Sequence, residues 1–199
     1  MKKFSLVLCV ALILPALASA DDNAARYYIP PSQFNAALQI MDLGFSNVFG
    51  LFRNATGSFT FDSSAKSISD VKLAIDATSL TANSPDNEQA LESLLAAGQY
   101  PEVDFVARDE TKFSDGKAEI KGTLTLHGIS KPVTLQATLN HVGKSPNGGG
   151  MWSDEGEAVG LSLRGDFKRA DFGMTDDPNA PARFGDTVTL MLETQAIRQ

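Results

Sequence analysis

Residues 122–140 have the sequence Gly-Thr-Leu-Thr-Leu-His-Gly-Ile-Ser-Lys-Pro-Val-Thr-Leu-Gln-Ala-Thr-Leu-Asn. Apolar and polar residues alternate strictly on both sides of a central turn, a pattern typical of half-buried antiparallel strands. Leu124 and Leu126 share one face of the first predicted strand, and Leu135 lies on the apolar face of the second. We therefore predict a β-hairpin with one apolar and one polar face. A single hairpin is not stable alone, so other strands must cover its apolar face.

The connection within this hairpin is predicted at residues 127–132. Gly128 tolerates a positive φ angle, as a tight turn requires. Pro132 has no N–H to donate, so we place it at the start of the second strand.

The first twenty residues have the organisation of a secretory signal peptide. Lys2 and Lys3 precede an almost wholly apolar run over residues 4–17, and Ala18-Ser19-Ala20 follows it. This order predicts cleavage after Ala20, because small residues mark the cleavage site. The run is short for a membrane span, which makes an uncleaved anchor the weaker alternative. We expect residues 1–20 to be removed and residues 21–199 to form one domain in the periplasm, or outside the cell if secreted.

The composition excludes several kinds of partner and site. The chain has a formal net charge of −7, and the predicted signal peptide holds two lysines and no acid, so its removal makes the mature charge −9. Such an acidic protein repels nucleic-acid backbones and anionic membranes, so we expect no nucleic-acid partner. The one cysteine, Cys9, lies in the signal peptide. A mature chain without cysteine can have neither a disulfide nor a thiolate site.

The rest of the chain predicts about eight strands and one helix. The helix is expected over residues 84–98, with Ser84 as N-cap, Pro85 as first helical residue and Gly98 as the C-terminal stop. Residues 43–52 break the alternation and are interpreted as an apolar turn or short helix. Since closure removes exposed strand edges, we predict an all-β, eight-stranded antiparallel barrel with short helical turns.

The sequence offers little for catalysis or metal binding. We expect His127 to be a solvated turn residue, and His141 has no acid at metal-ligand spacing. The glycines at positions 160 and 165 stand too far apart for a nucleophile elbow. No phosphate-binding loop, dinucleotide fingerprint or calcium loop is present. We therefore expect no enzyme activity, no metal and no resident cofactor.

Phenylalanines recur along the predicted barrel, with twelve in the chain. They allow two interpretations, a packed core or the lining of an apolar cavity. The aromatic segment at residues 43–52 favours the second, because it needs an apolar feature, such as a barrel mouth, to cover. The candidate ligand-binding residues are Phe34, Leu38, Phe45, Phe49, Phe52, Phe59, Phe61, Leu73, Ile75, Leu94, Phe105, Leu124, Leu126, Phe167 and Phe172.

The opening hairpin resembles the signature hairpin of the YceI-like family of bacterial polyisoprenoid-binding proteins. Further blocks of the family's pattern follow in the same order along most of the mature chain. They are Leu43-Gly44-Phe45-Ser46-Asn47-Val48-Phe49-Gly50, Ala77-Thr78-Ser79-Leu80-Thr81, Tyr100-Pro101-Glu102-Val103-Asp104-Phe105, Arg169-Ala170-Asp171-Phe172-Gly173-Met174 and Gly185-Asp186 before the last strand.

The chain departs from the family pattern at three places. Asp42 stands where the family often has a histidine, Pro31-Ser32 replaces a His-Ser pair, and Asn87-Glu88 replaces an Arg-Asp pair. These positions bear on cargo preference rather than on the fold.

The resemblance implies a lipocalin-like barrel that carries a long isoprenoid, such as a quinone tail, or a similar fatty amphiphile. Two alternatives remain: an enzyme acting on such a lipid, and a structural or stress protein whose barrel is filled by side chains. A transient membrane contact and a homodimer also stay open.

Overall fold

The computed structural model describes residues 23–145, 156–175 and 182–199. The predicted signal peptide, and most of the Gly-rich segment after residue 143, lie outside these residues. The strands are β1 (Ala24–Ile29), β2 (Phe34–Asp42), β3 (Ser46–Phe52), β4 (Ala55–Asp62), β5 (Ser67–Asp76), β6 (Leu80–Ala82), β7 (Glu102–Ala107), β8 (Thr111–Lys112), β9 (Lys117–Leu126), β10 (Ile129–Lys144), β11 (Glu157–Lys168) and β12 (Phe184–Arg198). The helices are α1 (Pro85–Leu95) and the 3-10 turns η1 (Pro31–Gln33), η2 (Ala77–Ser79) and η3 (Arg169–Phe172).

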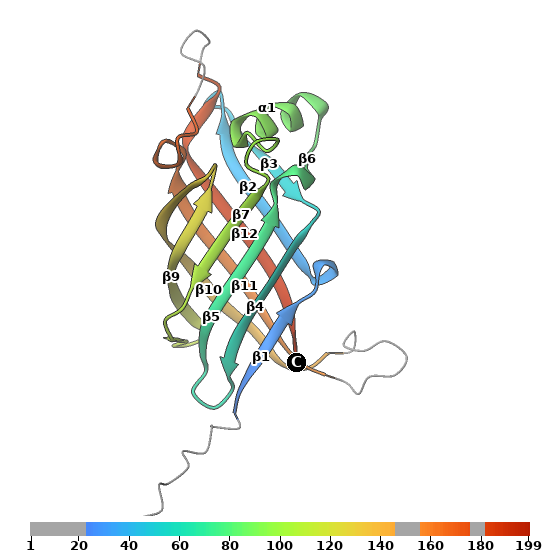
Figure 1. The fold of residues 1–199 in the computed structure, drawn as a ribbon, viewed down its shortest axis with the longest axis vertical. Coiled ribbons are helices and arrows are strands. Elements are labelled where there is room, and N and C mark those ends of the chain that lie inside the picture. The colour runs from blue at the N-terminus through green and yellow to red at the C-terminus, as the bar shows by residue number, and fades with distance from the viewer. Residues whose placement is uncertain (1–22, 146–155, 176–181) are drawn as a thin grey trace, which may run out of the picture.

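The strands close into a barrel. The pairing order β1-β4-β5-β7-β9-β10-β11-β12 returns to its start because β12 also pairs with β1, where Tyr28 lies opposite Ile197. Strands β2, β3 and β6 extend this wall beyond β12, and α1 crosses one end of the barrel (Figure 1). The predicted eight-stranded antiparallel barrel is confirmed.

The two-faced hairpin is confirmed as β9 and β10. Leu124 and Leu135 are each 1% exposed, whereas Gln136 and Thr138 on the opposite face are exposed. The predicted six-residue connection is wrong, because His127 and Gly128 alone form the turn, with φ angles of 53° and 71°.

Pro132 is therefore part of β10 rather than its start. It lies opposite Thr123 of β9, and the pairing of β10 with β11 begins only at Gln136. This part of β10 has one neighbouring strand, so a residue without an N–H is tolerated.

The helix begins as predicted and ends earlier. The Ser84 side chain accepts a hydrogen bond from the Asn87 amide at 3.2 Å, and Pro85 is the first helical residue. The predicted stop at Gly98 is wrong, because Ala96 already ends the helix in the left-handed conformation, with φ of 45°. Ala97, directly after it, is 5% exposed in the core. Tertiary packing thus turns the chain before it reaches the glycine.

The prediction of a turn or short helix over residues 43–52 is wrong. Most of this segment is strand β3, which pairs with β2 along its whole length. Val48 and Phe52 point inwards, whereas Phe49 and Leu51 point outwards. The strand does alternate, but both of its faces are apolar, so hydrophobicity alone does not show its period of two.

Candidate functional site

An apolar cavity lies inside the barrel at the end covered by α1. Its lining comes from α1 and six strands, together with the segment after η3. The lining residues are Leu38, Phe52, Leu94, Leu95, Val103, Leu124, Leu126, Phe167, Met174, Val188 and Leu190. None of these side chains is charged or can donate a conventional hydrogen bond, so the lining offers a ligand apolar contacts alone.

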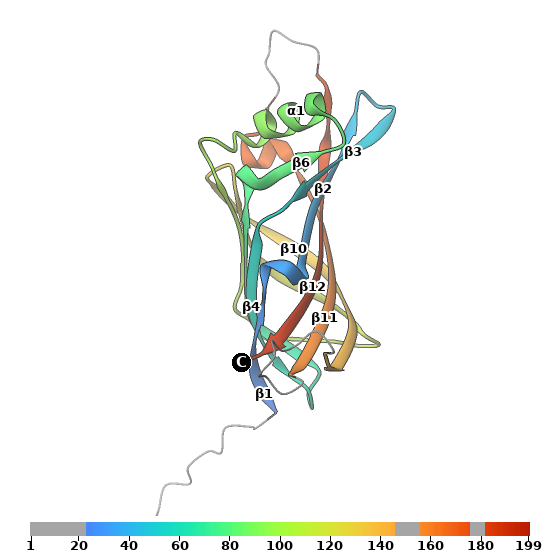
Figure 2. The same cartoon turned by 90° about the vertical axis from the view of Figure 1, so that its right-hand side faces the viewer.

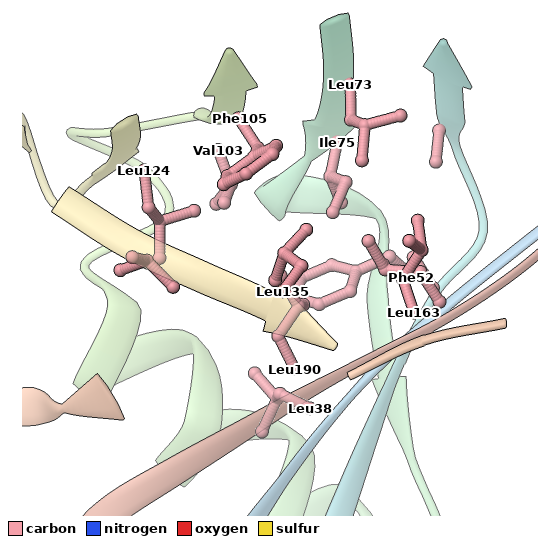
Figure 3. Packing of buried hydrophobic residues seen from close by; sticks show 14 of the residues in the cluster. Leu38, Phe52, Leu73, Ile75, Val103, Phe105, Leu124, Leu135, Leu163 and Leu190 are labelled. Atoms are coloured by element: carbon pink, nitrogen blue, oxygen red, sulfur yellow. The ribbon is translucent and has the colours of Figure 1, made fainter. Parts of the chain in front are cut away.

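The cavity is small in this structure. Its volume is about 20 Å³, and a single water molecule needs about 10–15 Å³. Figure 3 shows Leu38, Phe52, Leu124 and Leu190 directed from different strands towards one another across the interior. A ligand larger than water must therefore displace side chains or α1.

The sequence-predicted site residues separate into three groups. Those that line the cavity are Leu38, Phe52, Leu94, Leu124, Leu126 and Phe167. Those buried in the same core without lining it are Phe34, Phe59, Phe61, Leu73, Ile75, Phe105 and Phe172. The remaining two, Phe45 and Phe49, lie on the outer surface.

Phe45 and Phe49 require a correction, because the sequence analysis assigned them to the barrel lining. Phe45 is 91% exposed at the turn between β2 and β3, and Phe49 is 48% exposed on the outer face of β3. Successive side chains of a strand point to opposite faces. Because Val48 points into the barrel, its neighbour Phe49 must point outwards. Of the three phenylalanines in this segment, only Phe52 contacts the cavity.

Sequence reasoning missed five lining residues: Leu95, Val103, Met174, Val188 and Leu190. The alternation of β7 and of the last strand, together with the apolar stripe of the helix, was sufficient to find four of them. Met174 follows η3 in no regular element, so no periodic signal marks it.

Polar contacts hold α1 over the cavity. The Glu88 carboxylate accepts hydrogen bonds from the Thr81 hydroxyl at 2.9 Å and from the Ala82 amide at 3.0 Å. The Ala82 amide, followed by the Thr81 hydroxyl, lowers the pKa of Glu88 below its ordinary value, because both stabilise the charged form. The start of the helix is thereby tied to β6.

A second contact joins the helix to β2 and to Arg183, the residue before β12. The Arg183 guanidinium donates to both carboxylate oxygens of Asp42, at 2.9 and 3.3 Å, and to the Asn87 side-chain oxygen at 2.5 Å. The hydrogen bond to Asp42 raises the pKa of Arg183. Two departures from the family pattern, at positions 42 and 87, thus meet at one arginine.

Arg169 shapes the segment that carries Met174. It is 9% exposed and donates to the carbonyl oxygens of Gly185, Met174 and Phe184, at 3.1, 2.8 and 3.2 Å. A buried guanidinium needs such acceptors, and here they fold the chain around η3. These three hydrogen bonds give Arg169 a structural role.

The two histidines lie away from the cavity. His127 occupies the β9–β10 turn and packs on the ring of Tyr100, with 4.5 Å between ring centroids. His141 follows the register shift between β10 and β11. Within residues 23–145, 156–175 and 182–199, no group of three His, Cys, Asp or Glu side chains could hold a metal ion. None of the helices in these ranges is long and apolar enough to cross a membrane.

Comparison with known proteins identifies the family. The YceI-like domain family matches residues 27–196. The chain belongs to the YceI-like family. It is 31% identical to Protein YceI of Salmonella arizonae over 203 residues, covering all of both chains.

Solved YceI-like structures share the fold. The Campylobacter jejuni YceI protein matches with a TM-score of 0.65 and 26% identity, over 80% of this chain and 90% of that one. A structure described as a polyisoprenoid binding domain from Saccharophagus degradans matches with a TM-score of 0.59 and 12% identity, over 88% of this chain and 99% of that one. At that identity the second match shows the fold alone.

Proposed function

We propose that this YceI-like protein is a periplasmic carrier that holds the tail of a long-chain isoprenoid, or of a similar fatty amphiphile, inside its barrel. The observation that carries the proposal is a closed barrel whose internal cavity is lined only by apolar side chains. The description of the Saccharophagus degradans relative as a polyisoprenoid binding domain supports the same class of cargo. A transient contact with the membrane that holds the lipid is part of this proposal.

Cargo binding requires the interior to open, because the cavity now has room for about one water molecule. Helix α1 is the element best placed to move. Leu94 and Leu95 supply its part of the lining, and Glu88 and Asn87 connect its first turn to the barrel wall. Movement of the helix end around Leu94 would enlarge the cavity without separating any pair of barrel strands.

Affinity in such a site depends on the length of the buried tail. Burying one CH₂ group is worth roughly 0.8 kcal/mol, so one five-carbon isoprene unit contributes about 4 kcal/mol before association costs. Because the lining has no polar side chain to recognise a headgroup, headgroup chemistry should have a weaker effect.

Thermal melting of delipidated protein with quinones of increasing tail length tests the proposal. A ligand at 100 times its dissociation constant adds about 2.7 kcal/mol to the free energy of unfolding. Each kcal/mol shifts the melting temperature of a domain of this size by roughly 2–4 °C. We expect a long-tailed quinone to raise it by about 5–11 °C and a tail-less analogue to have almost no effect.

Two variants of α1 separate binding in the cavity from binding elsewhere. Leu94→Trp should reduce the shift by filling the cavity, whereas Ser93→Trp, on the exposed face of the same helix, should leave it unchanged. Equal shifts from tailed and tail-less compounds would contradict tail recognition. No shift from either would favour the second candidate, a structural protein with a filled barrel, which the small cavity volume specifically supports.

The proposal assigns no chemical step to the protein. General acid–base catalysis needs a titratable group within hydrogen-bonding reach of the substrate. The side chains that line the cavity are leucine, phenylalanine, valine and methionine, and none of them titrates. Recovery of chemically unchanged lipid after incubation would agree with a carrier, whereas a modified lipid would favour the alternative of a barrel enzyme.

The periplasmic location is proposed from the order of residues 1–20 alone. Intact-mass measurement of protein from the periplasmic fraction should show a chain that begins at Asp21. A mass that includes residues 1–20 would contradict cleavage.

A further inference from the structure

Exposed large apolar side chains concentrate on the β2–β3 hairpin. Among the described residues seven such side chains are exposed, and five of them lie between positions 41 and 51. We call these five the hairpin patch. They are Met41, Leu43, Phe45, Phe49 and Leu51, at 38%, 60%, 91%, 48% and 54% exposure. Scattered apolar residues are ordinary on a protein surface, but a cluster of this kind marks an interaction site.

The turn at the tip of this hairpin holds an apolar residue, Leu43, in an unfavourable backbone conformation. Leu43 and Gly44 have φ angles of 48° and 76° and are the two central residues of a β-turn within the three-residue connection 43–45. The first position of such a turn favours Asn, Asp or Gly, and a branched apolar side chain there costs about 1–2 kcal/mol. The chain therefore presents Leu43 to solvent although local conformational energy opposes it.

The base of the tip is held by specific contacts. Asp42 pairs with Arg183, and the Leu43 amide donates to the Arg183 carbonyl oxygen at 2.7 Å. The Phe45 amide donates to the Asp42 carbonyl oxygen at 3.0 Å. Leu43 and Phe45 are thus carried on a fixed turn, and Figure 2 shows the hairpin extending away from the barrel beside α1.

We propose that the hairpin patch is a membrane-docking surface that inserts Leu43 and Phe45 into the interfacial region of a neutral, zwitterionic lipid bilayer. A convex tip with apolar side chains at its apex fits a deformable apolar medium. Apolar side chains that enter the acyl boundary bind in proportion to the buried apolar area.

The size of the patch argues against a second copy of the chain as the partner. At roughly 200 Å² for a full large side chain, the five exposed fractions correspond to about 600 Å². A stable protein–protein interface needs about 800 Å² from each partner, and a projecting tip does not complement itself. A bilayer has no such lower limit, because lipids rearrange around the inserted side chains.

Charge selects the class of lipid. The chain has a formal net charge of −7, and the five patch residues carry no charge. Electrostatic attraction therefore cannot bring this protein to an anionic bilayer, and apolar insertion must supply the affinity. Binding to phosphatidylcholine should equal or exceed binding to phosphatidylglycerol and should vary little with salt.

Docking would bring the cavity end of the barrel to the lipid. Strands β2 and β3 carry the hairpin patch on their outer surface and contribute Leu38 and Phe52 to the cavity on their inner surface. The inference thus extends the proposed carrier function by naming the membrane-facing surface. It is tested without cargo, so its failure and the failure of tail binding are separate results.

Flotation of the delipidated mature chain with phosphatidylcholine vesicles tests the inference. We expect the wild-type protein to float with the vesicles and the double variant with Leu43→Asn and Phe45→Ser to bind at least tenfold more weakly. Asn tolerates the left-handed conformation and Phe45 is 91% exposed, so both substitutions are compatible with folding. Tyr28→Ser removes a side chain of 38% exposure outside the patch and is the matched control, with unchanged binding expected.

Tryptophan fluorescence tests whether the side chain at position 45 itself enters the lipid. With the native Trp152 replaced by Phe in both variants, Phe45→Trp should show a blue shift and quenching by brominated lipid when vesicles are added, and Tyr28→Trp should not. Three results would overturn the inference: no flotation of the wild type, equal flotation of the double variant, or binding that needs anionic lipid and low salt. A concentration-dependent dimer that Leu43→Asn abolishes would instead assign the patch to a second copy.

Discussion

The hairpins β9–β10 and β2–β3 are both antiparallel and both turn through residues with positive φ angles, but they differ in the chemistry of their outer faces. Each connection contains two consecutive residues with positive φ angles, His127-Gly128 in a two-residue connection and Leu43-Gly44 in a three-residue connection that ends with Phe45. The first hairpin buries one apolar face and exposes Gln136 and Thr138 on the other. The second also buries one apolar face, but it exposes Phe49 on the other.

The comparison shows that folding accounts for the buried apolar face of each hairpin but not for the exposed apolar face of β2–β3. One apolar face is sufficient to attach a hairpin to the barrel core, as β9–β10 demonstrates. The second apolar face of β2–β3 contributes little to the core and leaves large side chains in water. Such a surface needs a reason outside the folded domain, and a binding partner is the simplest one.

The largest expected effect on stability comes from placing a charge on the buried face of the β9–β10 hairpin. Leu126 is 4% exposed, so Leu126→Asp leaves a buried carboxylate without a partner. We expect a loss of roughly 3–5 kcal/mol in the free energy of unfolding, measured by urea denaturation.

Thr138→Asp is the control on the opposite face, because Thr138 is exposed and lies opposite Lys117. Its free energy of unfolding should change by no more than about 0.5 kcal/mol. Comparable destabilisation by the two substitutions would show that the hairpin does not have a buried and a solvated face.

A glycine in each hairpin compares how tightly the two are packed. An added Cβ at Gly122 of β9 would lie 2.4 Å from the Phe105 ring and 2.7 Å from the backbone oxygen of Val106. At Gly50 of β3 the nearest atoms are the ends of the Leu80 and Leu91 side chains, at 3.0 Å. Backbone cannot move as easily as a leucine methyl group, so Gly122→Ala should cost about 1–3 kcal/mol and Gly50→Ala less.

Differential scanning calorimetry of both alanine variants checks this order. If Gly50→Ala lowered the melting temperature more than Gly122→Ala, the close backbone contact at Gly122 would not determine which substitution destabilises the protein more.

The smallest expected effect has the opposite sign and concerns the two turns. Leu43→Asn replaces a leucine at φ of 48° with a residue that tolerates this conformation. It should stabilise the protein by about 1 kcal/mol and raise the melting temperature by roughly 2–4 °C. His127→Asn, at the equivalent position of the other turn, should bring no gain, because histidine already tolerates positive φ and His127 packs on Tyr100.

Thermal melts of the two asparagine variants in parallel make the comparison. A lower melting temperature for Leu43→Asn would mean that Leu43 makes a stabilising contact within the domain. In that case the backbone strain at Leu43 would no longer support a function for the hairpin patch.

Local patterns were sufficient to predict much of the molecule. The alternation through residues 122–140 predicted which side chains of β9 and β10 are buried, because a period of two divides a strand into two faces. The cap chemistry of Ser84 and Pro85 predicted the first turn of α1, since it depends on neighbouring residues alone. The order of the family blocks predicted the family and its barrel.

Tertiary structure alone decided the features that depend on residues far apart in the chain. It decided that Phe52 faces the cavity while Phe45 and Phe49 face solvent, because pairing with β2, rather than hydrophobicity, sets the faces of β3. It also decided that the cavity has room for about one water molecule, since that volume is the small difference between a barrel's interior and the side chains that fill it. Hydrophobic periodicity counts apolar residues, but it does not measure the space that remains between them.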